Sequence, residues 1–390
     1  MVSEKISLKW AFILSASCYY LQGIESLPGQ AFFYYLKETL HFTPSKIMYL
    51  SSIIGIAWLI KPFLGYLIDL LKWKKKTWIL IALLTDIILA LSIGLLSLPL
   101  IILITFFTVK STCAAFRDIS VDGIMVVEGQ KNNCCGKIQA VQWISIMIAC
   151  IITGIGGGYI AEKFNYQVGY LLLIPVFIIV GIIAFLYKEQ DTVSDKLNFK
   201  KVKNLIQDKR YLIGGILFLF FYCFSPSFGT PLMFIQRDEF HWSKLFIGIL
   251  GTIVSIVEII GAVLYYKFSK KINVRKWLIG SVYLGATTTM CYLYYTPLTA
   301  IIYSILFCLV GMFIHLIILD YTARIIPKGL ETTAFALLCS VINLSSTTSN
   351  ITGAWLLPIV GLKPLIIISS LTSFLCLAFI KYVRVDNGTN

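Results

Sequence analysis

The acidic and basic side chains that lie within long apolar stretches are the first candidates for chemistry in this sequence. An ionisable group at the centre of a bilayer costs at least about 2.5–3.5 kcal/mol, so such groups usually face a partner or a water-filled cavity. They are too numerous here to be accidents of segment ends: Glu25, Lys61, Asp86, Lys110, Arg117, Asp118, Asp122, Glu128, Glu258 and Asp320. The pattern predicts a polar path for a solute or for protons inside an apolar scaffold.

The segment from residue 110 to residue 128 is the most densely charged of these stretches. On a helix with about 100° per residue, Lys110, Arg117 and Glu128 project within about 20° of one another. Asp118 and Asp122 are four residues apart and lie roughly 80–120° further round the helix. This charged face is expected to point into the protein. Two interpretations stay open: a solute or proton site, and a network in which Arg117 and carboxylates only hold helices together.

Gln22 and Glu25 stand beside residues that interrupt a helix, namely Gly23, Pro28 and Gly29. A later apolar stretch is interrupted in the same way by the prolines and the glycine of Ser225–Pro231. Broken backbone at membrane depth is tolerated only where it is buried in protein or lines a cavity. Interruptions at corresponding places in two halves of a chain indicate a transport site, and kinks that serve packing are the alternative.

The elements that must position these residues are transmembrane helices. Of the 390 residues, 58% are hydrophobic and 13% are charged, whereas a soluble domain carries about 25% charged residues. A spanning helix needs about 20 mostly apolar residues. The sequence predicts an all-α membrane protein with twelve such spans, at 8–36, 45–71, 77–97, 99–127, 136–161, 167–187, 211–236, 244–266, 277–296, 298–323, 331–358 and 361–382.

The basic residues support this topology. With the N-terminus inside, 24 lysines and arginines fall in inside segments and six in outside loops, which favours cytosolic termini under the positive-inside rule. The net charge of +14 comes from short basic runs such as Lys74-Lys75-Lys76, so no nucleic-acid partner is expected. The cysteines show no metal-ligand spacing, and neither a metal nor a cofactor is expected.

The only long polar stretch, residues 188–210, divides the chain into predicted six-helix bundles at 1–187 and 211–390. Weak internal similarity supports a repeat. Leu40-His41-Phe42 follows the first span, and Phe240-His241-Trp242 follows the seventh. Two six-span halves joined by a cytosolic linker are the plan of the major facilitator type.

Several motifs, in order along nearly the whole chain, resemble the folate-biopterin transporter family, a branch of the major facilitator superfamily. Tyr20-Leu21-Gln22-Gly23 resembles the family's first span, and Trp58-Leu59-Ile60-Lys61-Pro62 with Gly65 and Asp69 resembles its second. The run from Arg117 to Glu128 resembles the family's Asp-x-x-x-Asp-x-x-x-Val-Glu motif. Arg117 replaces the small residue expected there, which puts the choice of substrate in doubt.

The resemblance implies a secondary transporter that moves a folate- or pterin-like organic anion by alternating access. We expect it to be a monomer in the cell membrane, either an inner or a plasma membrane. The residues expected to bind the substrate are Gln22, Glu25, Lys61, Lys110, Arg117, Asp118 and Asp122. Glu25 and Asp320 are expected to couple transport to protons. Gly65, Asp69 and Glu128 are expected to serve gating.

Three other functions remain as alternatives. The first is a major facilitator transporter of another solute, such as S-adenosylmethionine, a nucleotide-like anion or a muropeptide. The second is an intramembrane prenyltransferase, because Asp118-x-x-x-Asp122 superficially resembles its metal-diphosphate motif, although spans 7–12 lack a second Asp-rich motif. The third is a receptor or scaffold that has lost transport.

Overall fold

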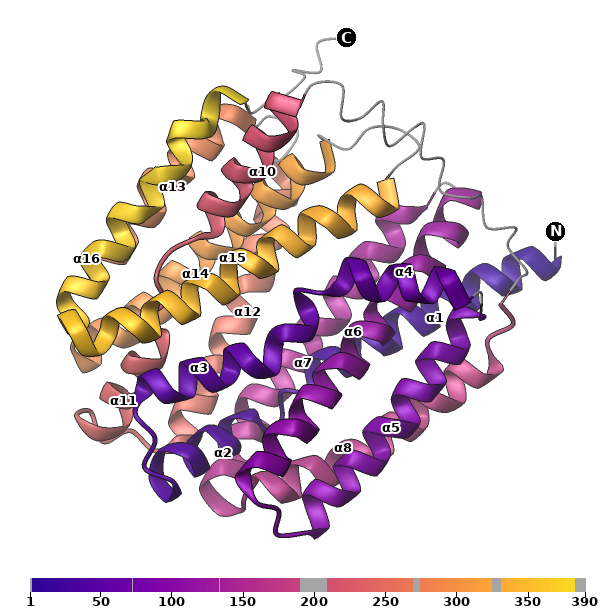
Figure 1. Cartoon of the computed structure of the whole chain (residues 1–390), viewed down its shortest axis with the longest axis horizontal. Helices are drawn as coiled ribbons and strands as arrows, with labels where there is room; N and C mark the ends of the chain where they lie inside the picture. Colours follow the sequence, from indigo (N-terminus) through magenta and orange to yellow (C-terminus); the bar gives the residue numbers. More distant parts are fainter. Residues whose placement is uncertain are drawn as a thin grey trace. The chain divides into compact units, whose positions relative to one another are not determined.

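The computed structural model describes residues 2–71, 73–132, 134–189, 209–268, 274–324 and 331–382, which are helical and contain no strand. Figure 1 labels most of the helices. In the first half they are α1 (Val2–Ile24), α2 (Gly29–Tyr34), a π-helical turn (Tyr35–Thr39), α3 (Pro44–Ile54), a 3-10 turn (Gly55–Trp58), α4 (Lys61–Leu71), α5 (Lys75–Leu95), α6 (Leu100–Lys131), α7 (Cys135–Lys163) and α8 (Tyr166–Leu186).

The second half continues the all-helical pattern. Its helices are α10 (Lys209–Cys223), α11 (Gly229–Asp238), α12 (Lys244–Phe268), α13 (Val274–Cys291), α14 (Pro297–Arg324), α15 (Glu331–Val360), α16 (Leu362–Thr372) and a 3-10 segment (Ser373–Tyr382). Most of the predicted linker, residues 190–208, lies outside the described residues.

Eight helical stretches of the described part are long and apolar enough to cross a membrane. Large apolar side chains also cover the outside of the helices, as at Phe185 and Ile101, which are 71% and 69% exposed. Apolar surface on this scale indicates contact with lipid. An all-α membrane protein is therefore confirmed, and the count of twelve spans stays a prediction.

The chain forms two compact units. Unit 1 comprises residues 1–43, 53–193 and 242–255, and unit 2 comprises 44–52, 194–241 and 256–390. Helices α3 and α12 therefore contribute to both units. The predicted boundaries at 187 and 211 stay predictions.

Small residues let the helices of unit 1 approach closely. Helix α1 packs along α7, and α5 lies beside α8 (Figure 1). A Cβ atom added at Gly23 would lie 2.6 Å from the Cβ of Ala149, so this glycine permits the contact between α1 and α7. Gly158 similarly meets the backbone of Gly248 at the start of α12. These contacts show that glycines on α1 and α7 allow close helix packing.

The predicted interruption of the first span is present between α1 and α2. The backbone forms tight turns from Gly23 to Gly29, with the amides of Ser26, Leu27 and Gly29 each donating to the carbonyl three residues earlier. Pro28 has no N–H, so it cannot continue the α-helical bonding. Glu25 lies in this turn and not on a regular helix.

The second predicted interruption separates α10 from α11 at residues 224–228. Its free backbone groups are bonded by serines of other helices in unit 2. The amide of Ser225 donates to the hydroxyl of Ser349, and the amide of Ser227 donates to the carbonyl of Ser349, at 3.1 and 2.9 Å. The hydroxyl of Ser369 donates to the carbonyl of Pro226. Membrane proteins must satisfy broken backbone internally, and here side chains do so.

The histidines of the two repeated tripeptides have the same φ angle. His41 and His241 both have a φ of 51°, and they are the only residues other than glycine with positive φ in the described part of the chain. His41 lies between the π-helical turn and α3, and His241 lies between α11 and α12. A positive φ is uncommon for a residue with a Cβ atom, so the shared value supports the predicted repeat.

Candidate functional site

Four ionisable side chains from three segments of unit 1 form one ion-pair network. Lys110 on α6 lies 2.9 Å from Glu25, which is in the α1–α2 turn, and 3.4 Å from Asp86 on α5. Arg117, two turns further along α6, also pairs with both Glu25 and Asp86. Each cation therefore contacts both carboxylates. We call these four residues the charged cluster.

The charged cluster is buried. Asp86 is fully buried and Arg117 is 3% exposed, while the side chain of Glu25 is 12% exposed. The ammonium group of Lys110 lies 4.7 Å from the ring centroid of Phe177. Two carboxylates and two cations balance in charge. Removing one partner of such a buried set leaves an uncompensated charge, which costs about 3–5 kcal/mol.

Lys61 and Asp118 form a separate ion pair. Lys61 is the first residue of α4, directly after the helix is distorted at the 3-10 turn, and it pairs with Asp118 on α6. Its ammonium group also lies 4.4 Å from the ring centroid of Trp58. The side chains are 14% and 8% exposed. Lys61 is therefore only slightly exposed and already has a carboxylate partner.

Asp122 differs from the other carboxylates because its hydrogen-bond partners are neutral. The hydroxyl of Tyr19 donates to its Oδ1 at 2.8 Å, and the carboxamide of Gln142 lies 3.4 Å from the same oxygen. Its second oxygen, Oδ2, has no donor among the described residues. A carboxylate accepts through both oxygens, so Asp122 can still receive an N–H group from a ligand.

Several of the predicted site residues make no contact with the charged cluster among the described interactions. Gln22 is half-buried in α1, and it has no hydrogen-bond partner among the described residues. Gly65 on α4 faces Ile119 of α6, where an added Cβ would find ordinary contact at 3.6 Å. Glu128 is buried near the end of α6 and hydrogen-bonds to Tyr187. The side chains of Asp69 and Asp320 lie outside the described residues.

Sequence reasoning did not include Asp86 among the binding residues, although it had singled out this residue as a buried charge. Helix α5 offers no other ionisable residue between Thr77 and Leu95, and that isolation is the signal that a partner must exist on another helix. Tyr19 and Gln142 carried no such signal, because neutral polar residues are common in membrane helices.

Unit 2 has a pocket beside its helix interruption, with a volume of about 380 Å³. Residues of the interruption line it, together with Tyr292 and the α15 residues Ser346, Ser349 and Asn350. None of its lining residues carries a charge. The pocket therefore offers hydrogen-bonding groups but no charged side chain. We call it the neutral pocket.

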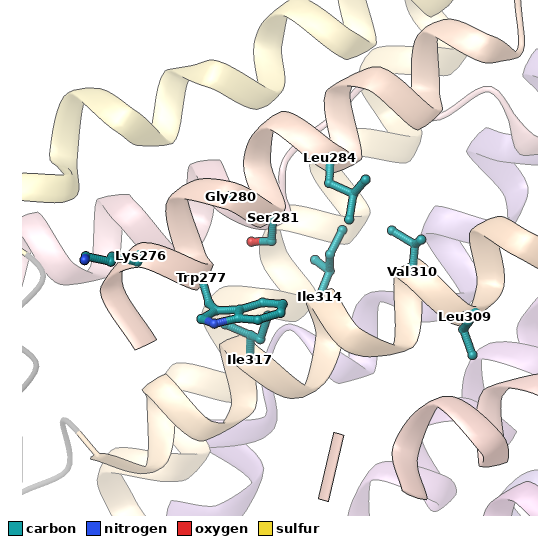
Figure 2. A pocket seen from close by; sticks show the side chains of 9 residues that line it. All are labelled: Lys276, Trp277, Gly280, Ser281, Leu284, Leu309, Val310, Ile314 and Ile317. Atoms are coloured by element: carbon teal, nitrogen blue, oxygen red, sulfur yellow. The ribbon is translucent and has the colours of Figure 1, made fainter. Parts of the chain in front are cut away.

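A second cavity of unit 2 is larger, about 530 Å³, and most of its lining is apolar apart from Lys276 and Ser281. Figure 2 shows Trp277 and Leu284 of α13 opposite Ile314 and Val310 of α14. The hydroxyl of Ser281 in this cavity is already bonded to Tyr222 at 2.6 Å. Because most of this surface is apolar, it suits contact with lipid chains better than the binding of a polar solute.

Comparison with known sequences places this geometry in context. A family model described as BT1 family matches residues 22–385. The folate-biopterin transporter of Synechocystis sp. is 26% identical over 418 residues, which cover 97% of this chain and 83% of that protein. Folate transporter 1 of Plasmodium falciparum is 26% identical over 360 residues, covering 85% of this chain and 69% of that protein.

Solved structures show the same fold at low sequence identity. A D-xylose-proton symporter superimposes with a TM-score of 0.79 and 12% identity, covering 98% of this chain and 99% of that one. The nucleoside transporter NupG gives a TM-score of 0.70 with 14% identity, covering 97% of this chain and 100% of that one. The fold is therefore of the major facilitator type.

Proposed function

The chain belongs to the BT1 family, and from this premise we propose that it carries a folate- or pterin-like organic anion by alternating access, in symport with protons. It is a multi-pass membrane transporter and not an enzyme. We further propose twelve spanning helices in two six-helix bundles, cytosolic termini and linker, a plasma-membrane location and a monomeric state.

The observation that carries this proposal is the charge balance of the charged cluster. Its two cations already have two carboxylates, so the carboxylate of an entering anion adds an uncompensated charge. A proton bound by Glu25 removes that charge. The same proton releases the Glu25 carboxyl group from Arg117 and Lys110. The substrate carboxylate then takes the place of Glu25, and the planar guanidinium of Arg117 can bind it in a bidentate way. One proton per bound substrate carboxylate follows.

Other residues take roles around this exchange. Asp86 stays ionised and keeps Arg117 oriented. Lys61 and Asp118 extend the polar surface. The carboxamide of Gln22 can donate to or accept from the rest of the substrate, and the free oxygen of Asp122 accepts from it. Asp320 is the second candidate for proton coupling. Gly65, Asp69 and Glu128 serve the conformational change.

Uptake into proteoliposomes tests the proposal. The parent protein should concentrate labelled folate, which carries the carboxylates that this coupling requires, under an inward proton gradient and stop when the gradient is collapsed. Glu25→Gln is permanently neutral, so it should still exchange substrate across the membrane but should no longer concentrate it. Glu258→Gln changes a half-buried carboxylate of α12 in unit 2 and is the matched control, which should accumulate substrate as the parent does.

Three results would each overturn a different part of the proposal. Accumulation by Glu25→Gln equal to that of the parent removes Glu25 from coupling. A parent that transports but ignores the gradient removes proton coupling altogether. A parent that carries S-adenosylmethionine, a nucleotide-like anion or a muropeptide in place of folate and pterin corrects the substrate.

Cysteine labelling tests the topology. A single cysteine at Lys163 should react with an impermeant reagent added outside, and one at Lys200 in the linker should not, because 24 basic residues lie on the linker side under the proposed arrangement. Reaction at Lys200 from outside contradicts the orientation.

A further inference from the structure

The neutral pocket of unit 2 offers polar groups that the fold itself does not use. The hydroxyl of Ser349 accepts from the amide of Ser225, and the hydroxyl of Ser225 donates to the carbonyl of Ser369, both at 3.1 Å. By contrast, the carboxamide of Asn350 and the hydroxyls of Ser346 and Tyr292 line the pocket without a hydrogen-bond partner among the described residues. A carboxamide supplies two donors and one acceptor within a single plane.

One wall of the pocket is aromatic and held in place. Phe228 meets Tyr292 edge to face, with 5.5 Å between their ring centroids. Tyr292 in turn contacts the rings of Tyr303 and Phe307 at 5.5 and 5.7 Å. Rings packed in this way are rigid, and a flat aromatic ligand stacks on such a surface at little cost in conformational entropy.

The pocket is unsuited to an ionised group. No lysine, arginine, aspartate or glutamate lines it, and burying a charge without a partner is strongly unfavourable. A neutral heterocycle with an amide-like edge fits better, because the carboxamide of asparagine pairs in a bidentate way with a ring that presents a donor beside an acceptor. The volume of about 380 Å³ lies within the range of ordinary small-ligand sites.

We propose that the neutral pocket binds the flat heteroaromatic ring of the transported solute, with the carboxamide of Asn350 pairing to the amide-like edge of the ring and the Phe228–Tyr292 wall packing against its face. This inference rests on the proposed function, since it assigns the ring of the same anionic substrate. A pteridine and a purine present the same edge chemistry, so the test must separate them.

Binding of molecular fragments to the full-length protein in nanodiscs tests the assignment. The probes are folate, which has the pteridine ring and the carboxylates, pterin, which has only the pteridine ring, and p-aminobenzoylglutamate, which has the carboxylates but no pteridine ring. Asn350→Leu keeps the side-chain size but removes the polar groups. It should weaken binding of folate and pterin by about tenfold or more. Binding of p-aminobenzoylglutamate should stay unchanged.

Thr348→Val is the matched control. Its hydroxyl donates to the carbonyl of Leu344 in its own helix, at 2.8 Å, and it does not line the pocket. This variant should bind all three probes as the parent does. Ser346→Ala is a second, milder test at an exposed position of the pocket in case Asn350→Leu fails to fold. It should weaken pterin binding by about threefold, the effect of one hydrogen bond.

The outcomes separate this inference from the proposed function. Pterin binding that is unchanged in both Asn350→Leu and Ser346→Ala overturns the ring site while the transporter assignment stands. A parent that binds none of the three probes contradicts the proposed substrate. A parent that binds guanine in place of pterin, with the same loss in Asn350→Leu, supports the ring site and replaces the pteridine with a purine.

Discussion

The charged cluster of unit 1 and the neutral pocket of unit 2 both lie beside an interrupted helix, but they offer opposite chemistry. The cluster contains four ionisable side chains that neutralise one another, whereas the pocket has hydrogen-bonding groups and aromatic rings without a charge. A folate-like molecule has the same division, with carboxylates at one end and a flat ring at the other. The comparison teaches that an interrupted helix can border an ion-pair network in one unit and an uncharged hydrogen-bonding pocket in the other.

The comparison is tested most strongly by removing a charge from unit 1. Arg117→Leu leaves Glu25 and Asp86 with only Lys110, so the free energy of unfolding should fall by about 3–5 kcal/mol. Thermal unfolding in detergent measures the loss. The double variant Arg117→Leu with Asp86→Leu restores one cation to one carboxylate and should recover most of it. Asn350→Leu in unit 2 should change stability by less than about 1 kcal/mol. Equal losses in the two units would break the distinction.

A smaller effect is expected where helix α15 contacts the interruption in unit 2. A Cβ added at Gly353 would lie only 2.0 Å from the carbonyl oxygen of Ser227. Gly353→Ala should therefore destabilise by about 3 kcal/mol and weaken pterin binding, because the pocket wall must shift. Gly280→Ala is the control, since nothing lies within 4 Å of its added Cβ. Similar melting temperatures for both variants would show that the interruption is not held against α15.

Ser349 provides a still smaller test of how the pocket is supported. Ser349→Ala leaves the amide of Ser225 without its partner and should cost about 1–2 kcal/mol. Thr348→Ala, which removes a hydroxyl bonded within its own helix, should be nearly neutral. Chemical unfolding of both variants gives the difference, and hydrogen exchange at the amide of Ser225 should be faster in Ser349→Ala alone. Unchanged exchange there contradicts the role of the serine.

The smallest effect on stability is expected at His41 and His241, the two turns that the halves of the chain have in common. His41 and His241 have the same positive φ, which glycine adopts more readily than histidine. His41→Gly and His241→Gly should therefore each shift stability by about 1 kcal/mol or less, with the same sign. Melting temperatures measure both. Opposite signs would mean that the two turns are not equivalent despite their shared conformation.

The helical fold and both interruptions could be predicted from the sequence, because apolar length, proline and glycine act locally. That Lys110 and Arg117 share one face of α6 could also be predicted, from helical periodicity. The carboxylate partners of these two cations could not be predicted, because the contact between Asp86 and Arg117 depends on how α5 packs against α6. Asn350 and Tyr292 were missed for a different reason. Neutral polar residues carry little energetic signal in a sequence, and only the folded chain brings them to one pocket.

Ser349 bonds both sides of the gap between α10 and α11, through its hydroxyl to Ser225 and its carbonyl to Ser227. Ser369 of α16 adds a third bond, to Pro226. The gap is therefore braced and does not act as a hinge, although the helix itself is broken there. Mechanically, α10, α11, α15 and α16 are expected to move as one rigid body, so that a displacement of α15 carries the walls of the neutral pocket with it.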